Sequence, residues 1–232
     1  VLDIVRAYAV GLQRLGLKAM PPAPASSATV EARPNVRAAL ALAEIGERKL
    51  ADQLFRHQAR IGDAREHAAL ATLAGGLDLP ETQLWLAHNG PSGAQSAISA
   101  RYPAPKGWTP TGGWRVDRSL VFAHALQESR FRADVTSHAG AKGLMQVMPG
   151  TARQMAAQRG EAVGSLNAPS VNLEYGQTYI EHLRDLGETG GLLPKVIAAY
   201  NAGPTPIGKW NLRMRDNADP LMYIESMPYW ET

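Results

Sequence analysis

The chain has 232 residues, of which 45% are hydrophobic and 19% charged, and it contains no cysteine. A chain of this length folds as one large domain or two small ones and buries most of its apolar surface. The absence of cysteine excludes disulfides, thiolate metal sites and a cysteine nucleophile. The formal charge is only +3, and the chain lacks the clustered basic stripe that nucleic-acid-binding proteins usually carry.

The start of the sequence resembles the interior of a longer protein. It has no initiator Met, charged leader or cleavage site, and Leu2, Val5, Ala9 and Leu12 share one helical face. We therefore expect a fragment whose targeting signal has been lost, beginning with an amphipathic helix over residues 1–18. No stretch approaches about 18 consecutive apolar residues, so we expect no transmembrane helix.

Residues 1–101 are predicted to be an α-helical region interrupted by a loop. The loop is residues 20–34, which contain four prolines. From Asn35 onward, alanine-rich helical segments are separated by glycines at positions such as Gly46 and Gly62. Short helices punctuated by glycine are typical of stacked helical hairpins, as in solenoid proteins.

A second boundary is predicted at residues 102–118, which contain three prolines and three glycines. It divides the chain into domains at 1–101 and 102–232. Helices are predicted beyond it at 119–128, from Pro149 onward, and at 171–186, 194–200 and 220–226. Almost nothing alternates with a period of two, so the predicted fold class is all-α.

Glu128 stands out because its helix is otherwise apolar nearly all round. Burial and the helix dipole at a C-terminal end both disfavour the carboxylate, and they raise the pKa of such a residue. A raised pKa suits a general acid that works near neutral pH. A solvated glutamate in the last helical turn is the alternative interpretation of this position.

Two further segments have the composition of a ligand site. Residues 137–151 bring glycines, Gln146 and two methionines into a short irregular loop, where function is often found. Residues 198–203 place Tyr200 beside Asn201 at the end of a helix, as an aromatic platform and an amide would be placed to hold a sugar. The alternatives are core packing for Met148 and Tyr200, and helix termination for Asn201.

Together these motifs resemble a known family. Glu128-Ser-Arg-Phe131, the run from Ser137 to Ala152 and Ala198-Ala-Tyr-Asn-Ala-Gly-Pro204 occur in the order found in soluble lytic murein transglycosylases. These enzymes belong to glycoside hydrolase family 23. The resemblance covers about residues 102–230. It implies a lysozyme-like helical catalytic domain, related to goose-type lysozyme, preceded by part of a superhelical region.

The resemblance also implies a reaction. These enzymes cleave the β-1,4 bond between N-acetylmuramic acid and N-acetylglucosamine in peptidoglycan. A single glutamate, here Glu128, protonates the leaving oxygen and then deprotonates the C6 hydroxyl of the muramyl residue. That hydroxyl closes on C1 and leaves a 1,6-anhydro end, so no second catalytic carboxylate is needed, unlike in most glycosidases.

The family's substrate contacts carry over onto seven positions. The residues expected to contact or support the sugar are Ser137, Gln146, Met148, Thr151, Ala199, Tyr200 and Glu225. The sequence departs from the family in two places. The chain stops at Glu231-Thr232, where the family usually continues, and His138 occupies a position that often holds a proline or a small residue.

The resemblance implies no cofactor and no metal. His124, four residues before Glu128, is interpreted as a core histidine, because no second histidine is near enough to complete a zinc site. Asp134 is interpreted as a solvated loop acid. The expected partners are peptidoglycan glycan strands, with no nucleic acid. We further expect a monomer in the periplasm or bacterial cell envelope, with proteins of the cell-wall machinery as possible partners.

Two alternative functions remain open from the sequence. A hydrolytic, goose-type lysozyme-like muramidase would use the same residues but let water attack in place of the C6 hydroxyl. A non-catalytic helical module that binds peptidoglycan would need no general acid, although the presence of Glu128 with the Gln146 and Tyr200 motifs argues against it.

Overall fold

The structure, a computed structural model, describes residues 27–92, 94, 96–213 and 219–227. The helix predicted at 1–18 lies outside them. All regular elements of the described residues are helices, with two isolated β-bridges at Thr136–Lys142 and Lys142–Val147, so the all-α prediction is confirmed. Across the same ranges, every helix is too short or too polar to cross a bilayer.

The chain forms two compact units that are interleaved in sequence. The first combines the chain up to Thr109 with Arg118–Val135, and the second combines Pro110–Asp117 with the chain from Thr136 onward. This division differs from the predicted boundary between residues 101 and 102. Residues 118–135 follow that boundary in sequence but belong to the same unit as the N-terminal helices. A separate catalytic domain over 102–232 stays a prediction.

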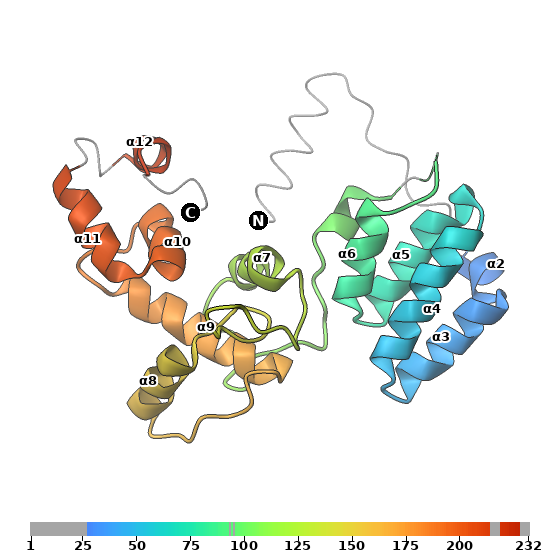
Figure 1. Ribbon diagram of the computed structural model, residues 1–232, viewed down its shortest axis with the longest axis horizontal. Helices are drawn as coiled ribbons and strands as arrows, with labels where there is room; N and C mark the ends of the chain where they lie inside the picture. Colours follow the sequence, from blue (N-terminus) through green and yellow to red (C-terminus); the bar gives the residue numbers. More distant parts are fainter. Residues whose placement is uncertain (1–26, 93, 95, 214–218, 228–232) are drawn as a thin grey trace. The chain divides into compact units, whose positions relative to one another are not determined.

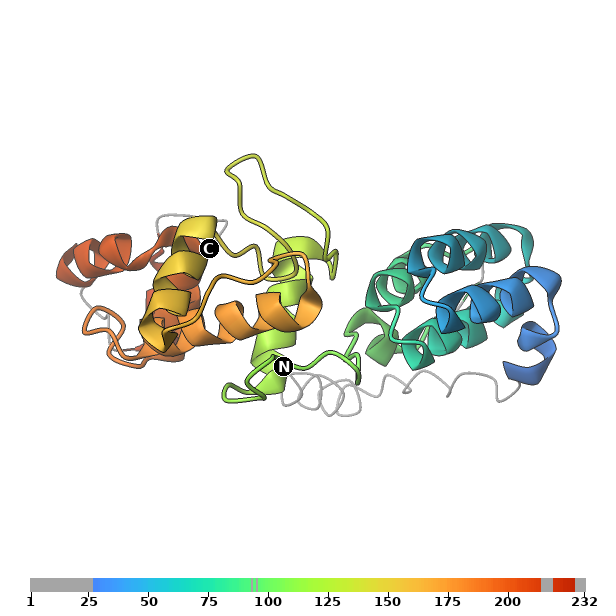
Figure 2. The same ribbon diagram turned by 90° about the horizontal axis from the view of Figure 1, so that it is seen from below.

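The first unit is built from helical hairpins. Its elements are α2 (Ser27–Glu31), α3 (Pro34–Glu44), α4 (Arg48–Ile61), η1 (Ala64–Glu66), α5 (His67–Gly76), α6 (Pro80–His88), η2 (Ile98–Arg101) and α7 (Arg118–Ser129). Helix α3 packs along α4 and α5 along α6, each pair joined by a short turn (Figures 1 and 2). The predicted hairpins are therefore present.

The core of these hairpins explains one error in the prediction. Val36, Phe55, Leu70 and Leu86 are almost fully buried where the helices meet. The proline-rich loop was predicted to run to residue 34, but α2 occupies Ser27–Glu31 and buries Val30. The run from 27 to 33 contains no proline, and burial of Val30 stabilises a helix there. Pro34, the last residue of the predicted loop, instead begins α3. A proline is tolerated there because the N–H of a first-turn residue has no partner within the helix.

Helix α7 is attached to the first unit by the residues that flank it. The Phe131 ring packs against Trp108 at 6.3 Å and against Phe122 at 6.1 Å between centroids. At the other end of the helix, the Arg118 guanidinium donates to the carbonyl of Pro105 at 2.8 Å. These contacts hold the apolar helix whose last turn carries Glu128.

The second unit is organised around one long helix. Its elements are α8 (Pro149–Arg159), α9 (Pro169–Arg184), α10 (Leu193–Ala202), α11 (Pro204–Arg213) and α12 (Pro220–Glu225). Helix α9 is buried along most of its length and packs against both α8 and α10 (Figure 1). It begins two residues earlier than predicted, at its proline, whereas α8, α10 and α12 lie at or within a residue or two of their predicted bounds.

Helix α11 was not predicted. Gly203, at φ +83, ends α10, and the sequence pattern predicts no further helix before residue 220. A proline is equally suited to the first turn of a new helix, and Ile207 and Trp210, three residues apart, bury one face of α11.

Candidate active site

Glu128 lies in the last turn of α7, on a helix whose Val121, Phe122 and Ala125 are buried. The side chain is partly buried, and this burial raises the pKa of Glu128 above the ordinary value. The cause is desolvation, which favours the uncharged acid. The direction of this pKa shift is the one that the predicted general acid needs.

The backbone just after Glu128 is held in an uncommon conformation. Arg130 has φ +54 and Phe131 has φ +63, both in the left-handed region that costs about 1 kcal/mol or more per non-glycine residue. The buried Phe131 ring compensates for this cost, since its side chain is only 2% exposed. The chain thus turns sharply at a fixed point, directly after the candidate acid.

In the second unit, the loop before α8 is held by a buried side chain of α9. Asn172 is 1% exposed, and its Oδ1 accepts a hydrogen bond from the Met145 N–H at 2.8 Å. Its Nδ2 donates to the carbonyls of Lys142 and Leu166 at 2.8 and 2.9 Å. One side chain therefore satisfies three backbone groups and fixes the loop against the helix.

Two glycines allow this close approach. Gly143 has φ +73, and a Cβ there would lie 2.4 Å from Asn172 Nδ2. On α9, a Cβ at Gly176 would lie 2.2 Å from Met145 Sδ. Real Cβ atoms do not approach other atoms so closely, so a side chain at Gly143 would clash with the backbone, and one at Gly176 would force Met145 to move.

Gln146 is presented by this anchored loop. Its φ of +47 is unusual for glutamine, and its side-chain Nε2 donates to the Gly143 carbonyl at 2.8 Å. Paired hydrogen bonds of 3.0 Å between Lys142 and Val147 close the turn on either side. The Gln146 side chain is therefore held against its own loop, as expected for a pre-organised binding residue.

A cavity of about 220 Å³ opens where this loop meets the end of α10. The Tyr200 hydroxyl donates to the Met145 carbonyl at 2.9 Å, and its ring lies 5.4 Å from that of Tyr179. The lining is Gln146, Val147, Met148, Thr151, Tyr179, Tyr200, Asn201, Ala202 and Gly203. Two aromatic rings beside amide groups suit a neutral, hydroxyl-rich ligand such as a sugar ring.

Four of the seven predicted sugar contacts line this cavity: Gln146, Met148, Thr151 and Tyr200. Ala199 is fully buried, so its side chain belongs to the core and not to the lining. Ser137 closes its own turn, with its hydroxyl accepting from the Ala141 N–H at 3.0 Å. Glu225 ends α12 and is exposed. Glu128 belongs to the other unit, and its catalytic role stays a prediction.

Sequence reasoning missed Asn172 and Tyr179. Both lie on α9, which was predicted only as a helix. Tyr179 follows Tyr175 by one helical turn. Two aromatic residues at that spacing share one face of the helix, and this pattern could have marked Tyr179 as a candidate. Asn172 was a second available signal. An asparagine on an apolar helix face is expected to be buried, and buried amide groups almost always have hydrogen-bond partners.

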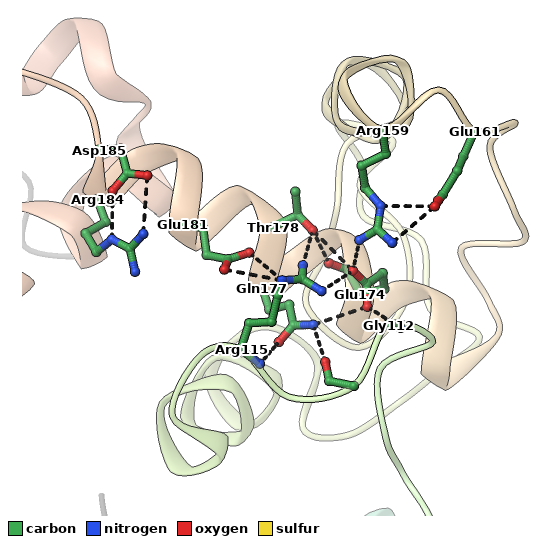
Figure 3. Close-up of polar contacts among 11 residues, drawn as sticks. Gly112, Arg115, Arg159, Glu161, Glu174, Gln177, Thr178, Glu181, Arg184 and Asp185 are labelled. Atoms are coloured by element: carbon green, nitrogen blue, oxygen red, sulfur yellow. Dashed lines mark hydrogen bonds and ion pairs between the residues drawn. The ribbon is translucent and has the colours of Figure 1, made fainter.

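A buried ion network ties α8 and the segment 110–117 to α9 (Figure 3). The Glu174 carboxylate, in a residue 2% exposed, accepts from the Gly112 N–H and from Arg115, each at 2.8 Å, and from Arg159. The adjacent Gln177 accepts from the Arg115 N–H and donates to the Gly113 carbonyl at 2.7 Å. Burial opposes the Glu174 charge, but these donors outweigh it and lower the pKa of Glu174.

His124 and Asp134 have the structural roles predicted for them. His124 is buried, its Nδ1 lies 2.9 Å from the Leu120 carbonyl, and burial lowers the pKa of the ring. Asp134 is 59% exposed and pairs with Lys49 at 2.6 Å, which lowers the pKa of this carboxyl. Among the described residues, no three His, Asp or Glu side chains are grouped to hold a metal.

Comparison with known proteins shows which family these residues resemble. The profile of the transglycosylase SLT domain matches residues 110–222, which include Glu128, the anchored loop and the cavity. Residues 110–222 are therefore similar to a transglycosylase SLT domain over just under half of the chain. The soluble lytic murein transglycosylase of Escherichia coli is 32% identical over 126 residues, and that of Salmonella typhimurium is 33% identical. A membrane-bound lytic murein transglycosylase C of Glaesserella parasuis is 37% identical over 121 residues.

Solved structures extend the likeness beyond the SLT domain. The 70 kDa soluble lytic transglycosylase of E. coli matches 96% of this chain with a TM-score of 0.74 and 25% identity. An inactive Glu-to-Gln variant of the lytic transglycosylase Slt from Pseudomonas aeruginosa matches with a TM-score of 0.66 and 28% identity. The chain spans 37% of each of these structures and 19% of the E. coli sequence. The helical fold implied by the resemblance is confirmed.

Proposed function

We propose that the chain contributes the catalytic part of a peptidoglycan lytic transglycosylase. The observation that carries this proposal is the match of residues 110–222 to the SLT domain, within which a partly buried glutamate and a sugar-sized cavity occur. The relatives are named as murein transglycosylases, and the chain spans only part of their length.

In the proposed reaction, Glu128 begins as the protonated acid. It donates its proton to the oxygen of the β-1,4 bond between N-acetylmuramic acid and N-acetylglucosamine, and the bond to C1 breaks. The resulting carboxylate then takes the proton of the muramyl C6 hydroxyl, whose oxygen bonds to C1. The acid is regenerated, no water is consumed, and the new end is a 1,6-anhydro sugar.

Binding falls to the residues around the cavity. Gln146 and Thr151 supply polar groups, and the rings of Tyr179 and Tyr200 supply apolar surface for a sugar face. Ser137 and Glu225 are proposed to contact or support the sugar as well. The same proposal places the enzyme in the bacterial cell envelope, as a periplasmic monomer that acts on glycan strands without a cofactor.

The test is digestion of purified peptidoglycan, followed by mass spectrometry. Transglycosylation gives products lighter by one water than those of hydrolysis, and Glu128→Gln should abolish them because the amide cannot transfer a proton. Hydrolytic products would support the muramidase alternative. Full turnover by Glu128→Gln would refute the role of Glu128.

A further inference from the structure

The first unit carries a groove of about 880 Å³ to which the proposed reaction gives no role. Helices α4 and α6 form one part of its lining through Arg56, Glu81 and Trp85, and the end of α7 contributes Arg130 and Arg132. Arg101, at the end of η2, completes the charged lining. Every one of these residues belongs to the first unit.

Most of the positive charge in this groove is available to a ligand. Arg56 is already committed, because it lies 2.7 Å from Asp52 and 3.0 Å from Glu81 and stacks over the Trp85 ring at 5.1 Å. That pairing neutralises Glu81, the one acid in the lining. The positive charges of Arg101, Arg130 and Arg132 remain in excess, and all three side chains are exposed.

Two of these arginines are presented by a fixed backbone. Arg130 and Arg132 flank the buried Phe131, whose ring packs on Trp108 and Phe122. Arg132 Nε donates to the Ser129 carbonyl at 2.9 Å, which orients its guanidinium. Their positions therefore do not depend on the ordering of a loose loop when a ligand binds.

We propose that this groove binds an acidic peptide, with Arg101, Arg130 and Arg132 receiving its carboxylates. Guanidinium groups match carboxylates with two parallel hydrogen bonds, and the excess charge here comes entirely from arginine. The volume lies near the top of the range of about 300–1,000 Å³ for small-ligand sites, which suits several residues of extended chain. A nucleic acid would need a longer basic stripe, and Glu81 interrupts this one. The proposal goes beyond the reaction, which concerns the sugar chain alone.

The test is fluorescence anisotropy of labelled hexaglutamate with the whole chain at low salt. We expect saturable binding that the double variant Arg101→Ala/Arg130→Ala weakens at least tenfold, because two charge-assisted pairs are lost. Arg37→Ala is the matched control, since this exposed arginine of α3 lies outside the groove. Hexaglutamine should not bind, and circular dichroism verifies that the variants are folded.

Two outcomes would overturn the proposal: equal affinity in the double variant and the wild type, or tighter binding of an oligothymidylate than of hexaglutamate. Repeating the titration with Glu128→Gln separates this inference from the proposed function. That variant should bind hexaglutamate as the wild type does while lacking turnover. Loss of peptide binding in this variant would contradict a groove that acts independently of the reaction.

Discussion

At the scale of single residues, the groups that matter most are held at a cost to stability. Glu128 is an acid in a partly desolvated place, and Gln146 adopts a backbone conformation that glutamine seldom takes. Both are supported by buried neighbours, Phe131 after the acid and Asn172 beneath the loop. Such costs concentrate at functional sites because the surrounding packing keeps them in place.

The raised pKa of Glu128 predicts how stability depends on pH. A carboxyl whose pKa is higher in the folded than in the unfolded chain favours folding below its unfolded pKa. That contribution is lost as pH rises through the folded value. Glu128→Gln removes the penalty, so we expect a higher melting temperature than wild type at pH 7 and no difference near pH 4. Thermal unfolding of both proteins from pH 4 to 7 measures this difference in melting temperature. A variant less stable than wild type at pH 7 would contradict the raised pKa of Glu128.

The same pKa shift sets the alkaline limit of activity. In the proposed reaction Glu128 starts as the protonated acid, so the alkaline limb of kcat/KM should lie above pH 4.5, the ordinary pKa of glutamate. Initial rates on peptidoglycan from pH 4 to 9 measure this limb. A decline centred at or below 4.5 would mean that another group is the acid.

At the scale of elements, α9 is the support on which the second unit is built. It buries Asn172, Glu174 and Gly176 within five consecutive residues, and these hold two different segments of the chain. Asn172 and Gly176 hold the loop that presents Gln146, and Glu174 holds α8 and residues 110–117. Changes on this helix should therefore affect the cavity indirectly.

Gly176→Ala tests the contact between α9 and the loop. Its Cβ would overlap Met145, so we expect a loss of about 1–3 kcal/mol in the free energy of unfolding, with weaker substrate binding. Gly150→Ala is the control in the same unit, since its nearest atom would be 3.9 Å away and alanine favours the helix. Denaturant unfolding compares the two, and equal stabilities would contradict the close packing.

Glu174→Gln tests the ion network in Figure 3. The lowered pKa means that Glu174 stabilises the fold above its unfolded pKa, ordinarily about 4.5, and that this contribution is lost as pH falls through the folded value. Removing the charge leaves Arg115 and Arg159 facing each other, at a cost of about 3 kcal/mol at pH 7. Stability measured from pH 3 to 7 should rise less steeply in the variant, and parallel curves would contradict the network.

The helices were predictable because their signals are local. Prolines at first turns, apolar spacing and terminating glycines located α8, α10 and α12, and the motif residues Gln146, Met148, Thr151 and Tyr200 do line one cavity. Helix α2 and the role of Asn172 were missed because they depend on contacts made far along the chain. The burial of the Ala199 side chain was not foreseen, because a motif gives a position in sequence and not the direction of a side chain.

At the scale of the whole molecule, the two units share the SLT domain between them. Residues 118–135 lie with the helical hairpins, yet the family profile spans them. The hairpins therefore do more than precede the catalytic region in sequence. They share one compact unit with the helix that carries the proposed acid, Glu128.

A chain of residues 102–232 tests this relation. Without the hairpins it lacks Lys49 and the α4 and α6 walls of the arginine-lined groove, so we expect α7 to be less stable. Hydrogen exchange measured by mass spectrometry should be faster in residues 118–129 than in the full chain, with lower activity on peptidoglycan. Equal protection of α7 in both chains would mean that the SLT domain stabilises this helix without the hairpins.

The interleaving of the two units also imposes an order on synthesis. Residues 110–117 leave the ribosome early, but their partner helix α9 ends at Arg184, some 67 residues later. At about 5–20 residues per second, the segment waits on the order of several seconds for Glu174 and Gln177. Meanwhile the hairpins and α7 can already assemble on either side of it. The nascent chain would then hold this segment as a loop, tethered at both ends, until its helix arrives.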